Sequence, residues 1–229
     1  VQAEMKTDEL LKRAESLEKQ QQELANETKN NKDAGKDQKN ADKQKDISKQ
    51  SDALQKEMEE LEKLMDELSD MPQEEFEKLK EEFEKQENQE LAEKAEQDLK
   101  QNKSQQAQQK MQQLSKNFEK TKQNLQNFKN SMQQQTQMQN FMEMMQLMDK
   151  MIDLSKEEEE LKKELQQGNR QHNESAQKQE KIRRSLDQML AQMTELSKKT
   201  FAITPEMGKA LGDAKQNMNQ TIDALQNRN

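Results

Sequence analysis

The sequence predicts an all-α fold: an elongated antiparallel coiled coil or helical bundle of about five helices, with one very long central helix. The first observation is the composition. The 229 residues include only 4 Gly and 2 Pro, with 28% hydrophobic and 37% charged residues. This is too little apolar content for an ordinary globular core, and strand-forming and turn-forming residue types are scarce. The second observation is that apolar residues recur at alternating spacings of three and four, as in helices that bury one stripe.

Intrinsic disorder is the alternative that such a composition raises. The net charge of −8 is small for this length, however, and charges of both signs are interspersed along the chain, as on a solvated helix surface. The periodic apolar stripe favours helices. We therefore expect disorder only near 29–46 and 100–108, where the stripe is lost.

Residues 7–71 predict a two-helix segment. Thr7 is a suitable N-cap, and the first stripe follows it. Residues 29–46 contain almost no apolar side chain and predict a polar loop, either a solvated turn or an arm that binds a partner. The second helix begins near Ile47 and ends at Asp70 or Met71, because the residue before Pro72 is disfavoured in a helix. The first stripe consists of Leu10, Ala14, Leu17, Gln21, Leu24 and Thr28.

Residues 72–167 contain neither Gly nor Pro after Pro72 itself, and they predict one long spine helix. Pro72 suits its first position. The apolar stripe weakens between 100 and 108, where we expect any break or bend. It then resumes with Met111, Leu114, Phe118, Thr121, Leu125, Phe128 and Met132.

Beyond Met138 the stripe doubles. One seam consists of Met138, Phe141, Met145, Met148 and Ile152, and the other of Met144, Leu147, Met151, Leu154, Leu161 and Leu165. Two adjacent seams make a face that one helix cannot cover, so this stretch is expected to contact at least two helices. The candidate partner or core face consists of Met138, Phe141, Met144, Met145, Leu147, Met148, Met151 and Ile152.

Residues 168–229 predict two C-terminal helices that pack back on 138–165. Gly168 ends the spine helix and opens a polar turn. Asn173 is a plausible N-cap for the next helix. Thr204, Pro205 and Glu206 form a strong start signal for the last one, with an N-cap, a Pro at the first position and an acid in the first turn.

The sequence offers no catalytic, cofactor-binding or metal-binding constellation, so we expect no enzyme, no cofactor and no metal site. His172 is the single histidine and there is no cysteine, which excludes thiolate ligands and histidine-based triads. The acidic residues, such as the run Glu157 to Glu160, are flanked by Lys as on a solvated face. An acidic chain is a poor partner for nucleic acid, and no apolar run is long enough to cross a membrane.

The methionines are concentrated near the doubled stripe. Of the 16 Met residues, those from Met138 to Met151 suit either an ordinary core or an adaptable groove, because the side chain is flexible and polarisable. Closely spaced thioethers are also ligands for Cu(I). Core packing is the favoured interpretation, followed by the groove, with copper third.

Two segments resemble a known family. LMDKMIDLSKEEEEL, from Leu147 to Leu161, and ITPEMGKALG, from Ile203 to Gly212, are similar to helical segments of large uncharacterised bacterial envelope proteins of Bacteroidetes-type bacteria, a domain-of-unknown-function family. The similarity covers mainly residues 140–229. It implies a membrane hairpin elsewhere in the parent protein, a long helix-rich region outside the cytoplasm, and no known catalytic residue.

The leading functional hypothesis is a structural or scaffolding segment of a bacterial envelope protein that binds protein partners or copies of itself. It would contact a membrane only through parts of the parent protein absent from this chain. The alternative is a chaperone-like or adaptor module that uses the Met-rich face as a client groove. The sequence alone leaves the compartment open, with the envelope side implied by the resemblance.

Overall fold

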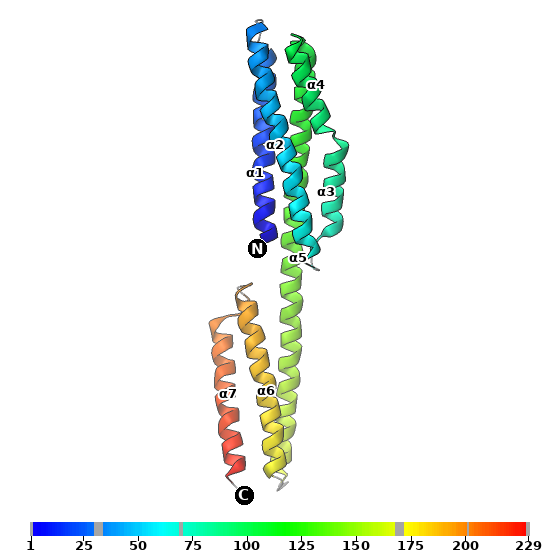
Figure 1. Ribbon diagram of the computed structural model, residues 1–229. Helices are drawn as coiled ribbons and strands as arrows, with labels where there is room; N and C mark the ends of the chain where they lie inside the picture. Colours follow the sequence, from blue (N-terminus) through cyan, green and yellow to red (C-terminus); the bar gives the residue numbers. More distant parts are fainter. Residues whose placement is uncertain (1, 30–33, 69–70, 168–171, 201, 228–229) are drawn as a thin grey trace. The chain divides into compact units, whose positions relative to one another are not determined.

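The computed structural model describes residues 2–29, 34–68, 71–167, 172–200 and 202–227, and in these ranges the fold is all-α, as predicted. Seven helices and no strand occur there (Figure 1). They are α1 (Gln2–Lys29), α2 (Ala34–Asp66), α3 (Gln73–Lys85), α4 (Asn88–Lys100), α5 (Ser104–Gln166), α6 (His172–Ser197) and α7 (Pro205–Gln226).

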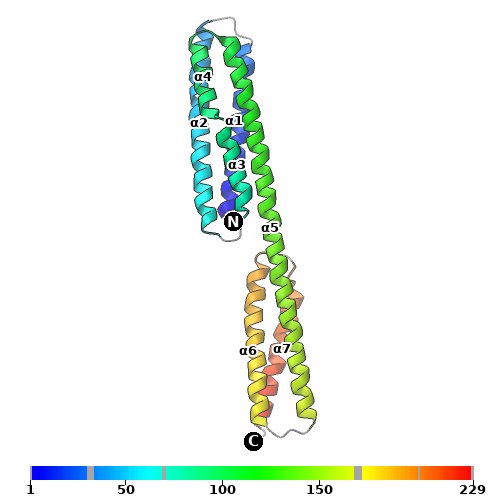
Figure 2. The same ribbon diagram turned by 90° about the vertical axis from the view of Figure 1, so that its right-hand side faces the viewer.

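The chain divides into two compact units, Val1–Gln135 and Thr136–Asn229. The first unit contains α1 to α4 and the N-terminal part of α5. The second contains the C-terminal part of α5 with α6 and α7 (Figures 1 and 2).

Neighbouring helices of the first unit run antiparallel. On α1 and α2, Arg13 pairs with Glu57 at 2.7 Å, whereas the later residue Glu27 pairs with the earlier residue Lys43 at 2.5 Å. The contacts between α1 and α5 and those between α4 and α5 are also antiparallel, since early residues of one helix meet late residues of the other. In both views α3 and α4 follow one another along one side of this unit. The unit is therefore a helical bundle in which α3 and α4 together take the place of one helix.

One apolar core runs through the first unit, and its members follow the predicted spacing. The rings of Phe76 and Phe128 meet with centroids 5.2 Å apart, which joins α3 to α5. The largest side chains that are fully buried are Phe76, Phe118, Phe128, Leu10, Leu17, Leu54, Met58, Leu61, Met65, Leu99, Met111 and Leu114.

The predicted polar loop at 29–46 is wrong over most of its length, because α1 extends to Lys29 and α2 begins at Ala34; residues 30–33 lie outside the described residues. The seven-residue repeat continues through this stretch with polar side chains at the buried positions. Asp37, Asn40 and Gln44 are each at most 4% exposed. Each has a buried or half-buried polar partner, so the stripe is maintained by hydrogen bonds instead of apolar contact.

The clearest of these contacts joins Gln21 of α1 to Gln44 of α2. Each amide donates to the oxygen of the other, with N–O distances of 2.8 and 3.1 Å. Nearby, Asn40 donates to the Thr28 hydroxyl at 3.1 Å, and that hydroxyl donates to the Leu24 carbonyl at 2.8 Å. These paired groups explain how a segment without large apolar residues is buried.

The predicted spine helix over 72–167 is also wrong, because the chain is interrupted twice. The first interruption, at Gln86 and Glu87, separates α3 from α4, and Glu87 has a left-handed backbone with φ of 48°. The buried Asn88 follows the buried Phe83 at an interval of five positions, where the repeat requires an interval of three or four. An unbroken helix would turn the α4 stripe roughly 140° away from the core at 3.6 residues per turn.

The second interruption reverses the chain at Gln101–Lys103, inside the zone where a break was expected. Asn102 has a φ of 58°, a conformation that Asn tolerates after a helix end. Its N–H donates to the Leu99 carbonyl at 2.9 Å, and the Lys103 N–H donates to that of Asp98 at 2.7 Å. As a result α4 and α5 form an antiparallel hairpin, and the long helix is α5 alone, with 63 residues.

The start of the chain differs from the prediction too. Thr7 is not an N-cap, since α1 begins at Gln2. Its buried hydroxyl instead donates to the Ala3 carbonyl at 2.8 Å, one turn earlier. The two-helix segment predicted for 7–71 therefore begins at the second residue, and its second helix ends at Asp66. The stop predicted at Asp70 or Met71 falls partly on 69–70, outside the described residues.

In the second unit, α6 lies antiparallel to the C-terminal part of α5, and α7 lies beside α6. Thr204 caps α7 by accepting a hydrogen bond from the Met207 N–H at 3.4 Å, and Pro205 is its first residue, as predicted. His172 begins α6 instead of lying in the preceding turn. The predicted turn from Gly168 lies mostly outside the described residues.

The amide pair of Gln21 and Gln44 makes a testable prediction. Gln44→Leu leaves the Gln21 amide buried without its partner and is expected to lower the free energy of unfolding by about 1–3 kcal/mol. Gln21→Leu together with Gln44→Leu removes both polar groups and is expected to restore most of the loss. Urea unfolding followed by circular dichroism measures both. The exposed Gln38→Leu serves as the control, and losses that simply add would contradict the paired contact.

Candidate functional site

The candidate site is the predicted partner or core face on the second half of α5, which the structure separates into two seams. One seam is covered. Leu147 is 6% exposed and packs in a cluster with Leu186, Met189, Met193 and Leu196 of α6, while Met144, Met151 and Leu154 pack half-buried against it. Residues of α7 join the same cluster, namely Met207, Leu211, Ala214 and Met218.

The other seam is open. Six large apolar side chains of α5 are exposed by 41–56%, and we call them the open stripe: Met138, Phe141, Met142, Met145, Met148 and Ile152. The covered seam shares its cluster with residues of both α6 and α7, in line with the predicted contact with at least two helices, but these helices do not cover the other seam. The reason is geometric, because the stripe lies on a side of α5 that α6 does not cover.

The open stripe keeps the regular spacing of a buried one. Without Met142, its members follow one another at intervals of three, four, three and four residues. The same intervals separate the buried residues of α1 and of the first half of α5. Met142 widens the stripe by one position. Met142 is not part of the predicted face, although its place four residues after Met138 puts it on the same side of the helix.

The N-terminal part of the open stripe lies in an uncharged stretch. From Asn130 to Met142 there is no charged residue, in a chain with 37% charged residues. The C-terminal part has charged neighbours, namely Glu143, Asp149, Lys150 and Asp153. An apolar strip bordered by amides lacks the clustered cations that phosphate binding requires.

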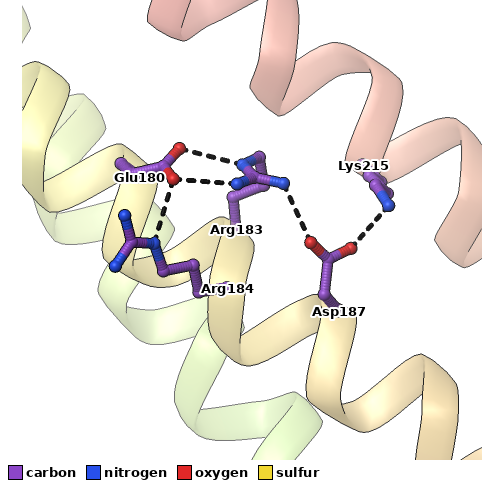
Figure 3. A network of polar contacts seen from close by, with 5 residues as sticks. All are labelled: Glu180, Arg183, Arg184, Asp187 and Lys215. Atoms are coloured by element: carbon purple, nitrogen blue, oxygen red, sulfur yellow. Dashed lines mark hydrogen bonds and ion pairs between the residues drawn. The ribbon is translucent and has the colours of Figure 1, made fainter.

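A network of ion pairs runs along α6 and reaches α7 through Lys215 (Figure 3). Arg183 donates to both carboxylate oxygens of Glu180, at 2.9 and 2.8 Å, and to Asp187 at 2.8 Å. Arg184 adds a hydrogen bond of 3.0 Å to Glu180. Lys215 of α7 pairs with Asp187 at 2.7 Å, and this ion pair joins the network to the second helix. This network was not predicted, although the spacings of three and four between charges on α6 were its signal.

Among the described residues, no group of three or more His, Asp or Glu side chains converges closely enough to hold a metal ion. Within the same ranges, no helix has the length and apolar content needed to cross a bilayer. The hollows on this surface are open grooves between helices, such as one of about 380 Å³ that Leu147, Lys150 and Gln192 help to line. Copper binding by the thioethers stays a prediction.

Comparison of the chain with models of protein families, with curated proteins and with solved structures gave no match. The resemblance to bacterial envelope proteins therefore stands on the two quoted segments alone.

The ion-pair network predicts an acid-resistant carboxylate. Hydrogen bonds from Arg183 and then Arg184 lower the pKa of Glu180 from 4.5 to about 2. Because the folded pKa lies below the unfolded value, the stabilisation is complete above pH 4.5 and is lost as the pH falls towards 2. Carbon-detected NMR of the Glu180 carboxyl is expected to give a midpoint near 2. Replacing both Arg183 and Arg184 by Met should return the midpoint towards 4.5, and an unchanged midpoint would contradict this cause.

Proposed function

We propose that this chain is a non-enzymatic structural or scaffolding segment of a bacterial envelope protein, and that it acts by binding protein through its helical surface. The observation that carries the proposal is the open stripe. Six large apolar side chains are exposed side by side, with about 600 Å² of surface if each exposes about half of roughly 200 Å². Contiguous apolar patches of this size are typical of interaction surfaces.

The envelope location and the elongated coiled-coil form are parts of the same proposal. The location rests on the resemblance of residues 147–161 and 203–212 to envelope proteins, and the form rests on the regular seven-residue repeat. The helical packing within each unit is consistent with a scaffold, because the apolar stripes of the described helices other than the open stripe pack against neighbouring helices.

The alternative, a chaperone-like or adaptor module, draws on the same side chains. Four of the six members of the open stripe are Met, which adapts its shape to varied partners. Such a module binds unfolded chains of unrelated sequence, whereas a scaffold seam with a fixed repeat selects a helix of matching spacing. The two functions therefore differ in what the open stripe accepts.

A photo-cross-linking residue at position 145 of the parent protein, in its native cells, tests the proposed function. We expect one discrete cross-linked species that is absent when the same residue stands at Asp153, which is exposed on α5 outside the open stripe. Loss of all cross-links at position 145 would contradict a protein-binding role.

A second measurement distinguishes the scaffold from the chaperone-like module. The purified chain is mixed at equimolar ratio with reduced, aggregating insulin, and light scattering is followed. A scaffold is expected to leave the aggregation unchanged. Suppression that disappears on Met145→Glu together with Met148→Glu would instead establish the chaperone-like role.

A further inference from the structure

We propose that the open stripe is a dimer seam, and that the occupant is the open stripe of a second copy of this chain, running antiparallel. The inference rests on the proposed protein-binding function and names the partner of that same surface. The spacing of the stripe, its area and the distribution of charge around it support this assignment.

The spacing identifies the occupant as a helix. On α1 and on the first half of α5, the apolar residues with this spacing are buried against other helices of the bundle. Such a stripe fits a partner helix with the same repeat, because side chains of one helix insert between those of the other. The open stripe itself has this repeat, so that two copies are complementary.

The area is sufficient for a pair. Each copy contributes about 600 Å² of exposed apolar side chain, so self-pairing buries about 1,200 Å² in total, which is near the lower end of specific interfaces. A twofold contact uses the same patch twice. A single patch of this size is therefore enough, and no second surface is needed.

The charge distribution favours a second copy over a foreign partner. This chain has a net charge of −8, so two copies repel each other over most of their surface. The repulsion is weakest around residues 130–142, which carry no charge. A foreign partner is usually selected by complementary charge, and here the stripe and its amide border offer none at its N-terminal half.

The acidic run Glu157–Glu160 sets the direction. In a parallel pair, each run lies within about 10 Å of its copy, the usual distance between packed helices. In an antiparallel pair centred on Met145, the two runs lie about 40 Å apart at about 1.5 Å per residue. The Debye length is about 8 Å at physiological salt, so the antiparallel pair avoids a repulsion that the parallel pair retains.

Light scattering coupled to size-exclusion chromatography tests the dimer with the whole chain. At about 100 μM the wild type is expected at twice the monomer mass of 27.0 kDa. Met145→Glu with Met148→Glu buries charge in the seam and is expected to weaken association by roughly 100-fold or more, which gives the monomer mass. Circular dichroism checks that the variant retains its helices.

A matched control adds the same two charges elsewhere. Gln146 and Gln177 are exposed outside the open stripe, so Gln146→Glu with Gln177→Glu is expected to leave the dimer mass unchanged. A monomeric wild type overturns the proposal, as does a dimer that survives the stripe substitutions or is lost in the control.

Disulfide formation tests the direction on a clean background, because the natural chain has no cysteine. A mixture of Met138→Cys and Ile152→Cys chains is expected to give mainly the mixed disulfide. Predominant disulfides between identical chains in that mixture would overturn the antiparallel arrangement.

The dimer seam and the protein-binding function can be contradicted separately. If the wild type is monomeric but position 145 cross-links to a different protein in cells, the second copy is wrong and the protein-binding function stands. If position 145 cross-links to nothing, the proposed function fails with it. Cross-links between two copies of the parent protein support both.

Discussion

Outside the second half of α5, each described helix has apolar side chains along one stripe, so its burial depends on a neighbour that lies along the same line. Isolated helices in water are marginal, and most of their stability in proteins comes from packing of the apolar face. The contact between Phe76 and Phe128 illustrates this dependence, since two helices meet through the largest side chains of their stripes. The low apolar content is therefore sufficient, provided that the stripes are covered.

Polar residues within the stripes limit how the helices can align. Gln21 and Gln44 satisfy each other only at one longitudinal position of α1 against α2. A shift by one heptad would leave both amides buried without partners, at a cost larger than that of losing an apolar contact of similar size. We interpret this pair as a device that fixes the alignment, in the way that a single buried Asn does in coiled coils.

The sequence predicted the helical class, most apolar core positions and the start of α7, because these follow from local spacing and capping residues. It failed at 34–46, where Asp37, Asn40 and Gln44 occupy buried positions. Polarity indicated a loop there, and only the partners on other helices make burial possible. The candidate face was predicted on α5, but which of its two seams is covered depends on the placement of α6, which the local pattern of α5 does not contain.

The interruption between α3 and α4 has a consequence for chain length. Without Gln86 and Glu87, the buried residues of α3 and α4 would follow one another at intervals of three and four without a gap, from Phe76 to Leu99. The two residues thus amount to an insertion into an otherwise regular repeat, and the left-handed Glu87 absorbs it. A sequence lacking both would form one straight helix in the same place, so homologues of this chain need not share its helix count to share its fold.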